Sequence, residues 1–435
     1  MRSHSLFHAL VALRHRNFRL IWVGLLASYT GTFMQNAAVL WHVSVLVPED
    51  RKALALGMVG LVRVGPIVFF SMVSGVAADA LDRRKLLVAT QVVLAVLAAV
   101  LAALTFAGLA AVWPIYLITG LTAAAAAFDL PARQSLIPTL VPREHLPSAI
   151  SLGTIMLQIA LVVGPSLGGV VIGTLGLAWV YTFDAVSYAA VVVALLMMRD
   201  VKGRPENGAR GFTVGAAFEG LRFVFRAPLI RSTMLLDFFA TFFSSAQALL
   251  PIFAQDILRV GAHGYGVLYA APAAGALLAS GLMVPAMQIV ERRGLVLIGA
   301  VGVYGLATVV FGLSRSFWLT YAMLAAAGAA DTVSMVFRNV IRQLETPDEL
   351  RGRMTGVNMI FFMGGPQLGE LEAGLVANWI GAPLSVVTGG VGCLVATAWV
   401  AAVTPRLRAY RREEAPSRDT PPARPGPPGA GGVSG

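Results

Sequence analysis

Five ionisable residues stand inside long apolar stretches of the sequence: Arg63, Asp184, Asp237, Glu370 and Glu372. One charged side chain at the centre of a lipid bilayer costs about 2.5–3.5 kcal/mol on insertion scales. Five unpaired charges would cost on the order of 12–18 kcal/mol, whereas the total stability of a folded protein is about 5–15 kcal/mol. We therefore expect each residue to pair with an opposite charge, to bind a proton, or to face a water-filled cavity.

A second group of charges follows an apolar stretch, in the run Gly75-Val-Ala-Ala-Asp79-Ala-Leu-Asp82-Arg83-Arg84. A glycine lets a neighbouring helix approach closely. A carboxylate at a helix end accepts hydrogen bonds from the N-terminus of another helix or from an arginine. An ordinary charged loop at a membrane surface has a similar composition. The run alone therefore favours neither a contact between helix ends nor a simple loop.

The composition defines the solvent in which these residues act. Of 435 residues, 57% are hydrophobic and 13% are charged, whereas soluble domains have about 25% charged residues. So few charges cannot cover water-soluble domains, and so many apolar residues exclude disorder for most of the chain. The single cysteine, Cys393, excludes an internal disulfide framework and metal sites built from several cysteines, and we expect no metal.

Continuous apolar runs of about 20 residues predict transmembrane helices rather than barrel strands. The sequence has about twelve such runs, at 18–47, 54–78, 86–108, 112–128, 148–172, 177–198, 229–254, 264–289, 295–313, 317–337, 355–377 and 380–403. The fold class is therefore an all-α membrane protein. We expect an N-terminal six-helix bundle over 1–198, a cytoplasmic linker over 199–228, a C-terminal six-helix bundle over 229–404, and a disordered cytoplasmic tail over 405–435.

Positive charge is distributed unevenly among the connections. Nearly all of the 33 Lys and Arg residues lie at the termini and in alternate connections, including Arg338 and Arg342, whereas the other connections hold only Arg51, Lys52, Arg259 and Arg315. The positive-inside rule then places both termini in the cytoplasm, in the inner or plasma membrane of a cell. The basic loops are expected to contact anionic lipids, and no nucleic-acid partner is expected.

The two halves of the chain carry matching signals. Arg133, Pro142 and Glu144 correspond to Arg338, Pro347 and Glu349 at one constant offset. Gly164, Pro165, Gly168 and Gly169 in the first half correspond to Gly365, Pro366 and Gly369 in the second, where we expect close helix packing. Duplicated bundles of this kind are typical of transporters that hold their substrate between the repeats.

These motifs resemble those of the major facilitator superfamily. Gly75, Asp79, Arg83 and Arg84 match the superfamily's signature between its second and third helices, although Ala80 and Asp82 depart from it. Gly164, Pro165, Gly168 and Gly169 resemble the antiporter motif, with Ala160 at its first glycine position. The run Phe128-Asp-Leu-Pro131-Ala-Arg133 is similar to the bacterial branch that contains enterobactin and drug exporters.

The resemblance implies two gates. At the inner gate, Asp79 would dock against the start of the eleventh helix, with Gly75, Arg83, Arg84 and Arg133 completing the latch. At the outer gate, the second and eleventh helices face each other in this superfamily, so Arg63 would pair with Glu370 or Glu372. A static pair that only compensates buried charge is an equal alternative.

The seventh helix lines the central cavity in this superfamily, which makes Asp237 a candidate substrate or proton site, because burial favours the protonated form of a carboxyl group. A structural role for Asp237 is the alternative. Tyr29, Gln35 and Asn36 are candidate cavity contacts, or ordinary interhelical hydrogen bonds. Asp184 is expected to be structural. The fourth helix, 112–128, lacks the arginine found in many proton-coupled drug exporters, which argues against copying their proton relay.

The sequence as a whole predicts a secondary active transporter. It has no glycine-rich nucleotide loop, so ATP is not the direct driver, and we expect no cofactor and no enzymatic activity. We expect a monomer that exports a small drug-like molecule or siderophore by alternating access, with protons as the coupling ion. An importer or facilitator, or a membrane receptor or scaffold that does not transport, are the alternatives.

Overall fold

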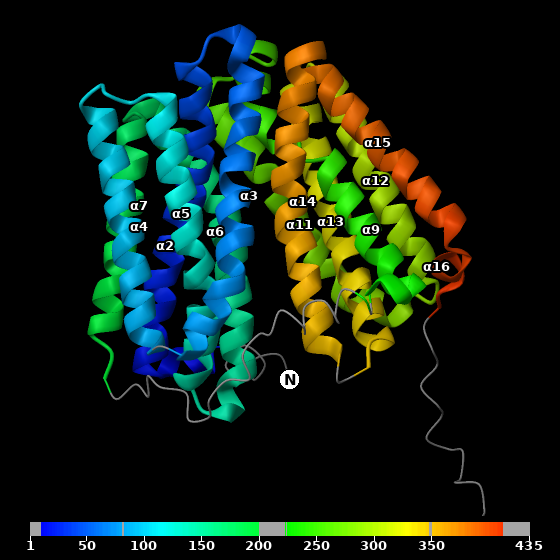
Figure 1. The fold of residues 1–435 in the computed structure, drawn as a ribbon, viewed down its shortest axis with the longest axis horizontal. Helices are drawn as coiled ribbons and strands as arrows, with labels where there is room; N and C mark the ends of the chain where they lie inside the picture. Colours follow the sequence, from blue (N-terminus) through cyan, green and yellow to red (C-terminus); the bar gives the residue numbers. More distant parts are fainter. Residues whose placement is uncertain (1–9, 81, 200–221, 223, 348–349, 412–435) are drawn as a thin grey trace, which may run out of the picture.

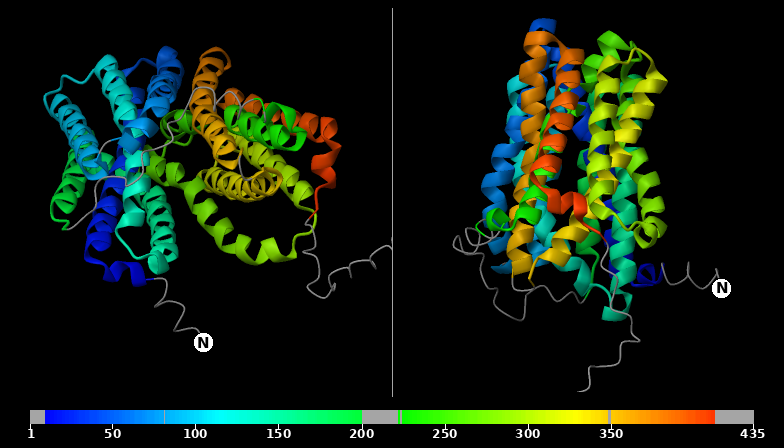
Figure 2. Two further views of the ribbon diagram at one scale, coloured as in Figure 1. Left: turned by 60° about the horizontal axis from the view of Figure 1, so that its bottom comes forward. Right: turned by 90° about the vertical axis from the view of Figure 1, so that its right-hand side faces the viewer.

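Long helices in two side-by-side bundles make up the chain (Figure 1 and Figure 2). The structure, a computed structural model, describes residues 10–80, 82–199, 222, 224–347 and 350–411. The first bundle contains α2 (Arg16–Leu46), α3 (Glu49–Ala80), α4 (Arg83–Phe106), α5 (Val112–Leu136), α6 (Leu146–Thr174) and α7 (Leu177–Leu196). The second contains α9 (Pro228–Phe243), α11 (Gly261–Ile289), α12 (Arg293–Leu313), α13 (Phe317–Glu345), α14 (Arg351–Ile380) and α15 (Ala382–Val403). The predicted twelve-helix, all-α architecture is confirmed for the part of the chain described.

In each bundle, the connection between the last two helices is made in the same way. Gly176 joins α6 to α7 with φ of 96°, and Gly381 joins α14 to α15 with φ of 86°. Only glycine adopts this left-handed backbone without steric cost, so both halves use glycine to reverse the chain abruptly. The two glycines occupy corresponding positions in the sequence repeat, which agrees with duplicated bundles.

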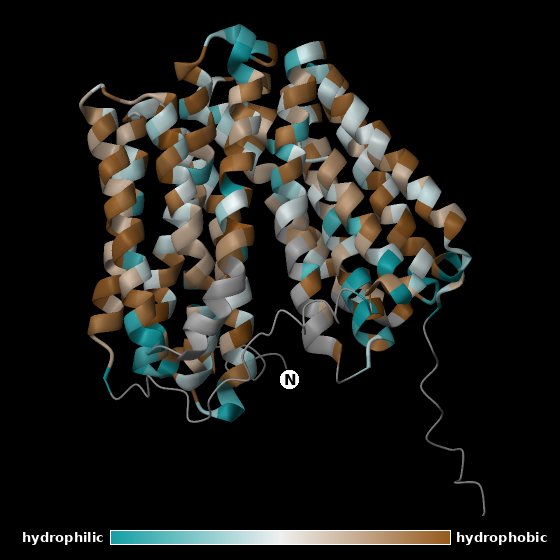
Figure 3. Cartoon of the chain, in the orientation of Figure 1, coloured by the Kyte–Doolittle hydropathy of each residue, from teal (hydrophilic) through white to brown (hydrophobic). Residues whose placement is uncertain are grey.

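Hydrophobic residues predominate along the helices of both bundles (Figure 3), and many of their large apolar side chains are exposed. Within the described residues, ten helical segments are long and apolar enough to cross a membrane. Trp113, Trp318 and Trp379 are largely exposed where α5 and α13 begin and α14 ends, as expected for tryptophans at a membrane interface. The chain is a multi-pass membrane protein.

Two helices continue well beyond their predicted ends. The fourth span continues past 128 to Leu136, and the tenth continues past 337 to Glu345. Arg133, Arg338 and Arg342 are therefore helical and buried, whereas the sequence analysis placed them in cytoplasmic connections. Arginines are tolerated there because buried carboxylates pair with them.

The seventh span, predicted as continuous over 229–254, is broken. Helix α9 ends at Phe243, and after a short irregular stretch the chain resumes as a single 3-10 turn over Gln247–Leu249, α10 (Leu250–Ile252) and a π-helical turn, η5 (Phe253–Ile257). Breaks of this kind leave backbone polar groups free inside a membrane protein and are tolerated where the segment lies within protein or lines a cavity.

The two bundles touch most closely at one end, which we call the joined end, where α3 and α11 begin and α6 and α14 end. A Cβ atom on Gly57 of α3 would lie 2.9 Å from the Cα atom of Gly374 on α14. A Cβ atom on Gly169 of α6 would lie 2.8 Å from the Cα atom of Gly266 on α11. Backbones this close pack without intervening side chains, which is how glycine stabilises helix contacts in membranes.

Candidate functional site

A cavity of about 320 Å³ lies between the bundles, beside the joined end. Its walls come from α2, α3 and α6 of the first bundle and from the broken seventh helix, α11, α13 and α14 of the second. The polar lining consists of Asn36, Arg63, Gln247, Tyr269, Asp331, Thr332, Gln367 and Glu370. Apolar helices thus enclose a chamber to which both halves contribute ionisable groups.

The three residues predicted to form the outer gate, Arg63, Glu370 and Glu372, have different surroundings in the structure. Arg63 donates through Nη2 to Oδ1 of Asn36 at 3.3 Å. Glu370 is only 5% exposed, and its Oε2 atom has no hydrogen-bond partner among the described residues. Arg63 and Glu370 line the same cavity, but no ion pair within 4.0 Å joins them among the described residues. Glu372 does not line the cavity.

A second cavity, of about 210 Å³, lies within the second bundle at the break of the seventh helix. Ser244 and Ser245 of the break line it, together with Tyr304 of α12 and Thr308. Gln247, Pro272, Gly328 and Asp331 line both cavities. The two spaces therefore adjoin through a wall that contains one carboxylate.

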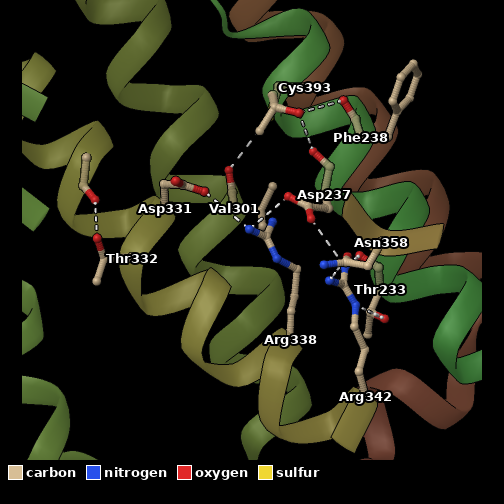
Figure 4. Close-up of polar contacts among 12 residues, drawn as sticks. Thr233, Asp237, Phe238, Val301, Asp331, Thr332, Arg338, Arg342, Asn358 and Cys393 are labelled. Carbon is tan, nitrogen blue, oxygen red and sulfur yellow. Dashed lines mark hydrogen bonds and ion pairs between the residues drawn. The ribbon is translucent and has the colours of Figure 1, made fainter. Parts of the chain in front are cut away.

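Asp237 of α9 is held between two arginines of α13 (Figure 4). Its Oδ1 atom lies 2.9 Å from Nη2 of Arg338, and its Oδ2 atom lies 3.3 Å from Nη2 of Arg342. Arg342 also donates to Oγ1 and the carbonyl oxygen of Thr233, and to Oδ1 of Asn358 on α14. All three charged side chains are almost completely buried. This network ties α9, α13 and α14 together around the carboxylate of Asp237.

Asp331 is the exposed member of this network. Its Oδ1 atom lies 3.4 Å from Nη2 of Arg338, and its side chain is 39% exposed and faces both cavities. The sequence analysis did not identify Asp331, although it stands inside the predicted stretch 317–337. It also missed that Arg338 and Arg342 are the partners of Asp237. The repeat relation between Arg133 and Arg338 was the available signal. Both arginines are buried in the structure, so this repeated position carries a buried arginine in each bundle.

The first bundle has its own buried charge cluster. Arg133 pairs with Asp129 one turn earlier on α5, and Asp129 also accepts hydrogen bonds from Thr90 and from Gln91, the latter at 2.6 Å. The guanidinium carbon of Arg133 lies 4.6 Å from the ring centroid of Tyr29, a cation–π contact. Tyr29 therefore contacts Arg133, and it does not line either cavity described here.

Of the remaining residues predicted to contact the cavity, one lines it and one does not. Asn36 lines the cavity between the bundles, whereas Gln35 is buried outside it. Asp184 is fully buried in the first bundle and accepts a hydrogen bond from Oγ of Ser187. Among the described residues, no three His, Cys, Asp or Glu side chains form a group that could hold a metal ion.

The residues of the predicted inner latch lie at the end opposite the joined end. Arg83 donates to the carbonyl oxygen of Ser135 on α5 at 3.2 Å, and Arg84 to that of Leu196 on α7 at 3.1 Å. Both contacts stay within the first bundle. Gly75 and Asp79 lie on α3, and their surroundings fall outside what the structure describes. Asp82, which replaces a glycine of the motif, accepts hydrogen bonds from two backbone amides at the start of α4.

At the joined end, an ion pair that the sequence analysis did not anticipate connects the bundles. Nζ of Lys52 on α3 lies 3.1 Å from Oδ2 of Asp256 in η5, and the lysine side chain is largely buried. Gln255 donates to Oγ of Ser44 at 2.8 Å beside it, and Tyr265 of α11 donates to the carbonyl oxygen of Ala37 on α2. Contacts between the bundles at this end are therefore both polar and apolar.

The two glycine–proline runs pack at equivalent places. Gly164 and Gly168 of α6 face the backbone of α2 near Thr30 and Met34. In the second bundle, Gly365 and Gly369 of α14 face α9 and the start of its break, while Pro165, Gly169 and Pro366 lie beside them in their helices. The fifth helix thus contacts the first, and the eleventh contacts the seventh.

The whole arrangement can be compared with known proteins. The family model described as transmembrane secretion effector matches residues 7–425. The chain belongs to this family. Members of the secretion effector family are transporters of the major facilitator superfamily, so the chain is a secondary transporter and not an enzyme.

Curated relatives and solved structures agree with this family. Enterobactin exporters of Escherichia coli O1:K1 and of Shigella boydii serotype 18 are 25% and 26% identical, each match covering 95% of both chains. A bacterial homologue of the lysosomal transporter Spinster has a TM-score of 0.70 at 16% identity, over 92% of this chain and 99% of that one. A bacterial homologue of ferroportin has a TM-score of 0.67 at 16% identity, over 91% and 99%. Both solved structures therefore have the same fold as this chain.

Proposed function

We propose that this transporter exports a small amphipathic molecule, a drug-like compound or a siderophore, in exchange for protons. The observation that carries the proposal is the cavity of about 320 Å³, lined by both bundles with apolar walls and a few ionisable groups. Such a lining suits a molecule that combines aromatic or apolar surface with polar groups. The relatives named above export a siderophore, which supports the same direction of transport.

The proposed topology places both termini in the cytoplasm of a cell bounded by an inner or plasma membrane. In that orientation the joined end faces outward, and anionic lipids contact the basic connections. Residues 1–198 and 229–404 form the two moving bundles, and 199–228 links them. Residues 405–435 were predicted to be a disordered tail, but the chain continues into a short helix, α16 (Pro405–Ala409), and Leu407 is buried in the core of the second bundle. The rest of the predicted tail, 412–435, lies outside the described residues. The chain acts as a monomer, because one copy supplies the walls of the cavity.

Transport proceeds by rocking of one bundle against the other around the cavity. With the joined end closed, the cavity serves the cytoplasmic side. Separation of α3 from α14 and of α6 from α11 opens the outer side, while the proposed inner latch, formed by Gly75, Asp79, Arg83, Arg84 and Arg133, closes the other. Import by the same movements is the alternative. The direction in which ethidium moves in the experiment below distinguishes import from export.

The test uses ethidium as the probe in everted membrane vesicles that contain the full chain. Acidifying the vesicle interior should drive ethidium inward, and collapsing the proton gradient should stop it. Replacing Ala273, a cavity-lining residue of α11, by tryptophan should reduce the initial rate by about tenfold, an effect of about 1.4 kcal/mol.

The matched control is Leu278→Trp on the same helix, at a side chain that is 72% exposed on the outer surface. It should transport like the unmodified protein. An equal loss of transport rate in Ala273→Trp and Leu278→Trp would contradict export through this cavity. Ethidium movement that does not depend on the proton gradient would contradict proton-driven export.

A further inference from the structure

We propose that Glu370 is the proton-binding residue of the transport cycle, and that the joined end closes only when its carboxyl group is protonated. The inference rests on the proposed function and assigns the residue at which protons act. It replaces the expected ion pair with Arg63 by a different role for the same glutamate.

Glu370 is placed directly in the contact between the two bundles. A Cβ atom on Gly60 of α3 would lie 2.9 Å from the Cβ atom of Glu370 and 3.2 Å from its Oε2 atom. Because Gly60 has no side chain, α3 covers the carboxyl group of Glu370 with its backbone. Closure of the joined end thereby shields this group from water on the outer side.

An ionised carboxylate is unfavourable at this position. Oε2 of Glu370 has no hydrogen-bond partner among the described residues. Burying a charge without a partner costs several kcal/mol, and such a group takes up a proton instead. Arg63, the cation among the described residues that line this cavity, donates to Asn36, and no hydrogen bond or ion pair joins it to Glu370 among the described residues.

The other buried acids do not combine these features. Asp129 pairs with Arg133, and Asp237 and Asp331 pair with Arg338. Asp184 lies within one bundle and lines neither cavity, so its surroundings stay the same when the bundles move. Of these acids, Glu370 alone lies both against the opposite bundle and on the cavity.

The groups that face Glu370 leave burial as the deciding influence. Arg63 of α3 favours the ionised form, Asp331 of α13 disfavours it, and Tyr269 of α11 is uncharged at neutral pH. From α9 and α15, which also pack on α14, no ionisable residue lines this cavity in the described part of the chain. The two charges act in opposite directions, so the change in exposure on closure decides.

The proposed sequence of events follows. When the bundles separate at the joined end, Glu370 meets outside water and its Oε atom takes a proton. The neutral carboxyl group can then be covered by Gly60, and the joined end closes. Water in the cavity, now connected to the cytoplasm, accepts the proton. One proton enters for each closure.

The test measures the joined end directly and needs no substrate. Spin labels on cysteines replacing Leu109 and Leu313, both exposed at this end of opposite bundles, report the distance between the bundles. Replacing Cys393 by serine removes the single native thiol. A second pair at Met197 and Leu344 reports the opposite end. The full chain is studied in liposomes from about pH 5 to about pH 9.

In the labelled protein that retains Glu370, the joined end should be closed at low pH, because closure requires that Glu370 has taken up a proton. The ratio of closed to separated molecules should fall by up to about tenfold per pH unit as pH rises. Glu370→Gln, which mimics the protonated form, should stay closed throughout. Glu370→Asp should restore the pH response. The control Asp50→Asn, at a side chain that is 71% exposed, should follow the parent protein.

A pH response that persists in Glu370→Gln, or a parent protein indifferent to pH, would overturn the proposal. If Glu370→Gln does not fold, infrared titration decides: the protonated carboxyl band lost on raising pH must shift in Glu370→Asp. Proton-driven ethidium transport by Glu370→Gln would refute this inference and leave the proposed function intact. A Glu370-dependent response in a protein that does not carry ethidium would refute only the proposed function.

Discussion

At the scale of single residues, the second bundle is stabilised by a carboxylate shared between two arginines. Asp237 compensates Arg338 and Arg342 in a region with almost no access to water. The group is therefore a structural tie between α9 and α13, with Asp331 as its branch toward the cavities. Removing the central carboxylate leaves two like charges buried together, which costs far more than the loss of a surface ion pair.

Asp237→Asn should lower the stability of the protein by roughly 3–5 kcal/mol, because it leaves buried arginine charge without a partner. The measurement is thermal unfolding of the detergent-solubilised full chain. Combining it with Arg342→Gln removes one charge of each sign and should recover part of the loss. An Asp237→Asn protein as stable as Asp50→Asn would show that the pair contributes little.

The sequence predicted that buried charges must be compensated but not how. Arg338 and Arg342 follow the apolar run 317–337, so charge counting placed them at the membrane surface. Only the packing of α9 against α13 brings them to Asp237. The sequence analysis considered only charged partners for Arg63, whereas its hydrogen bond in this structure goes to the neutral Asn36.

At the scale of helices, glycines determine where the bundles meet. Gly169 and Gly266 allow α6 and α11 to touch through their backbones, as Gly57 and Gly374 do for α3 and α14. The sequence predicted close packing at Gly164, Pro165, Gly168 and Gly169, but spacing alone does not tell which of these face a helix of the other bundle. The break after Phe243 was not predicted, because the apolar run is continuous across it.

Gly169→Ala should weaken closure of the joined end, because its new Cβ atom would lie 2.6 Å from the carbonyl oxygen of Ala262 and 2.8 Å from the Cα atom of Gly266. The separated population reported by the labels at positions 109 and 313 should rise by about tenfold, since overpacking costs about 1–3 kcal/mol. Gly153→Ala on the same helix meets nothing within 4 Å and should leave the distance unchanged. A similar distance distribution in both variants would mean that this contact does not hold the end closed.

At the scale of the whole molecule, two bundles with matching helix order meet at the joined end. The repeat of motifs predicted the bundles themselves, and Gly176 and Gly381 show it again in the backbone. The repeat could not predict which end is joined, because all conformations of a transporter share one sequence. The ion pair between Lys52 and Asp256 and the contact of Glu370 with Gly60 belong to this arrangement.

Reversing one charge of the pair, as in Lys52→Glu, should separate the joined end and slow ethidium transport severalfold. The expected cost is about 1–2 kcal/mol, between the values for exposed and buried pairs. Exchanging both residues, Lys52→Glu with Asp256→Lys, should restore the label distance and most of the transport. No recovery in the exchanged protein would indicate that the two side chains act separately.

The break in the seventh helix makes the two halves mechanically unequal. The first helix of the chain, α2, runs unbroken for 31 residues, whereas its counterpart is interrupted beside a cavity. A wall interrupted by short helical turns has more places where its backbone can bend than a wall built from one continuous helix. Cargo selectivity should therefore be easiest to alter by evolution on the C-terminal side, while the N-terminal side acts as a rigid frame.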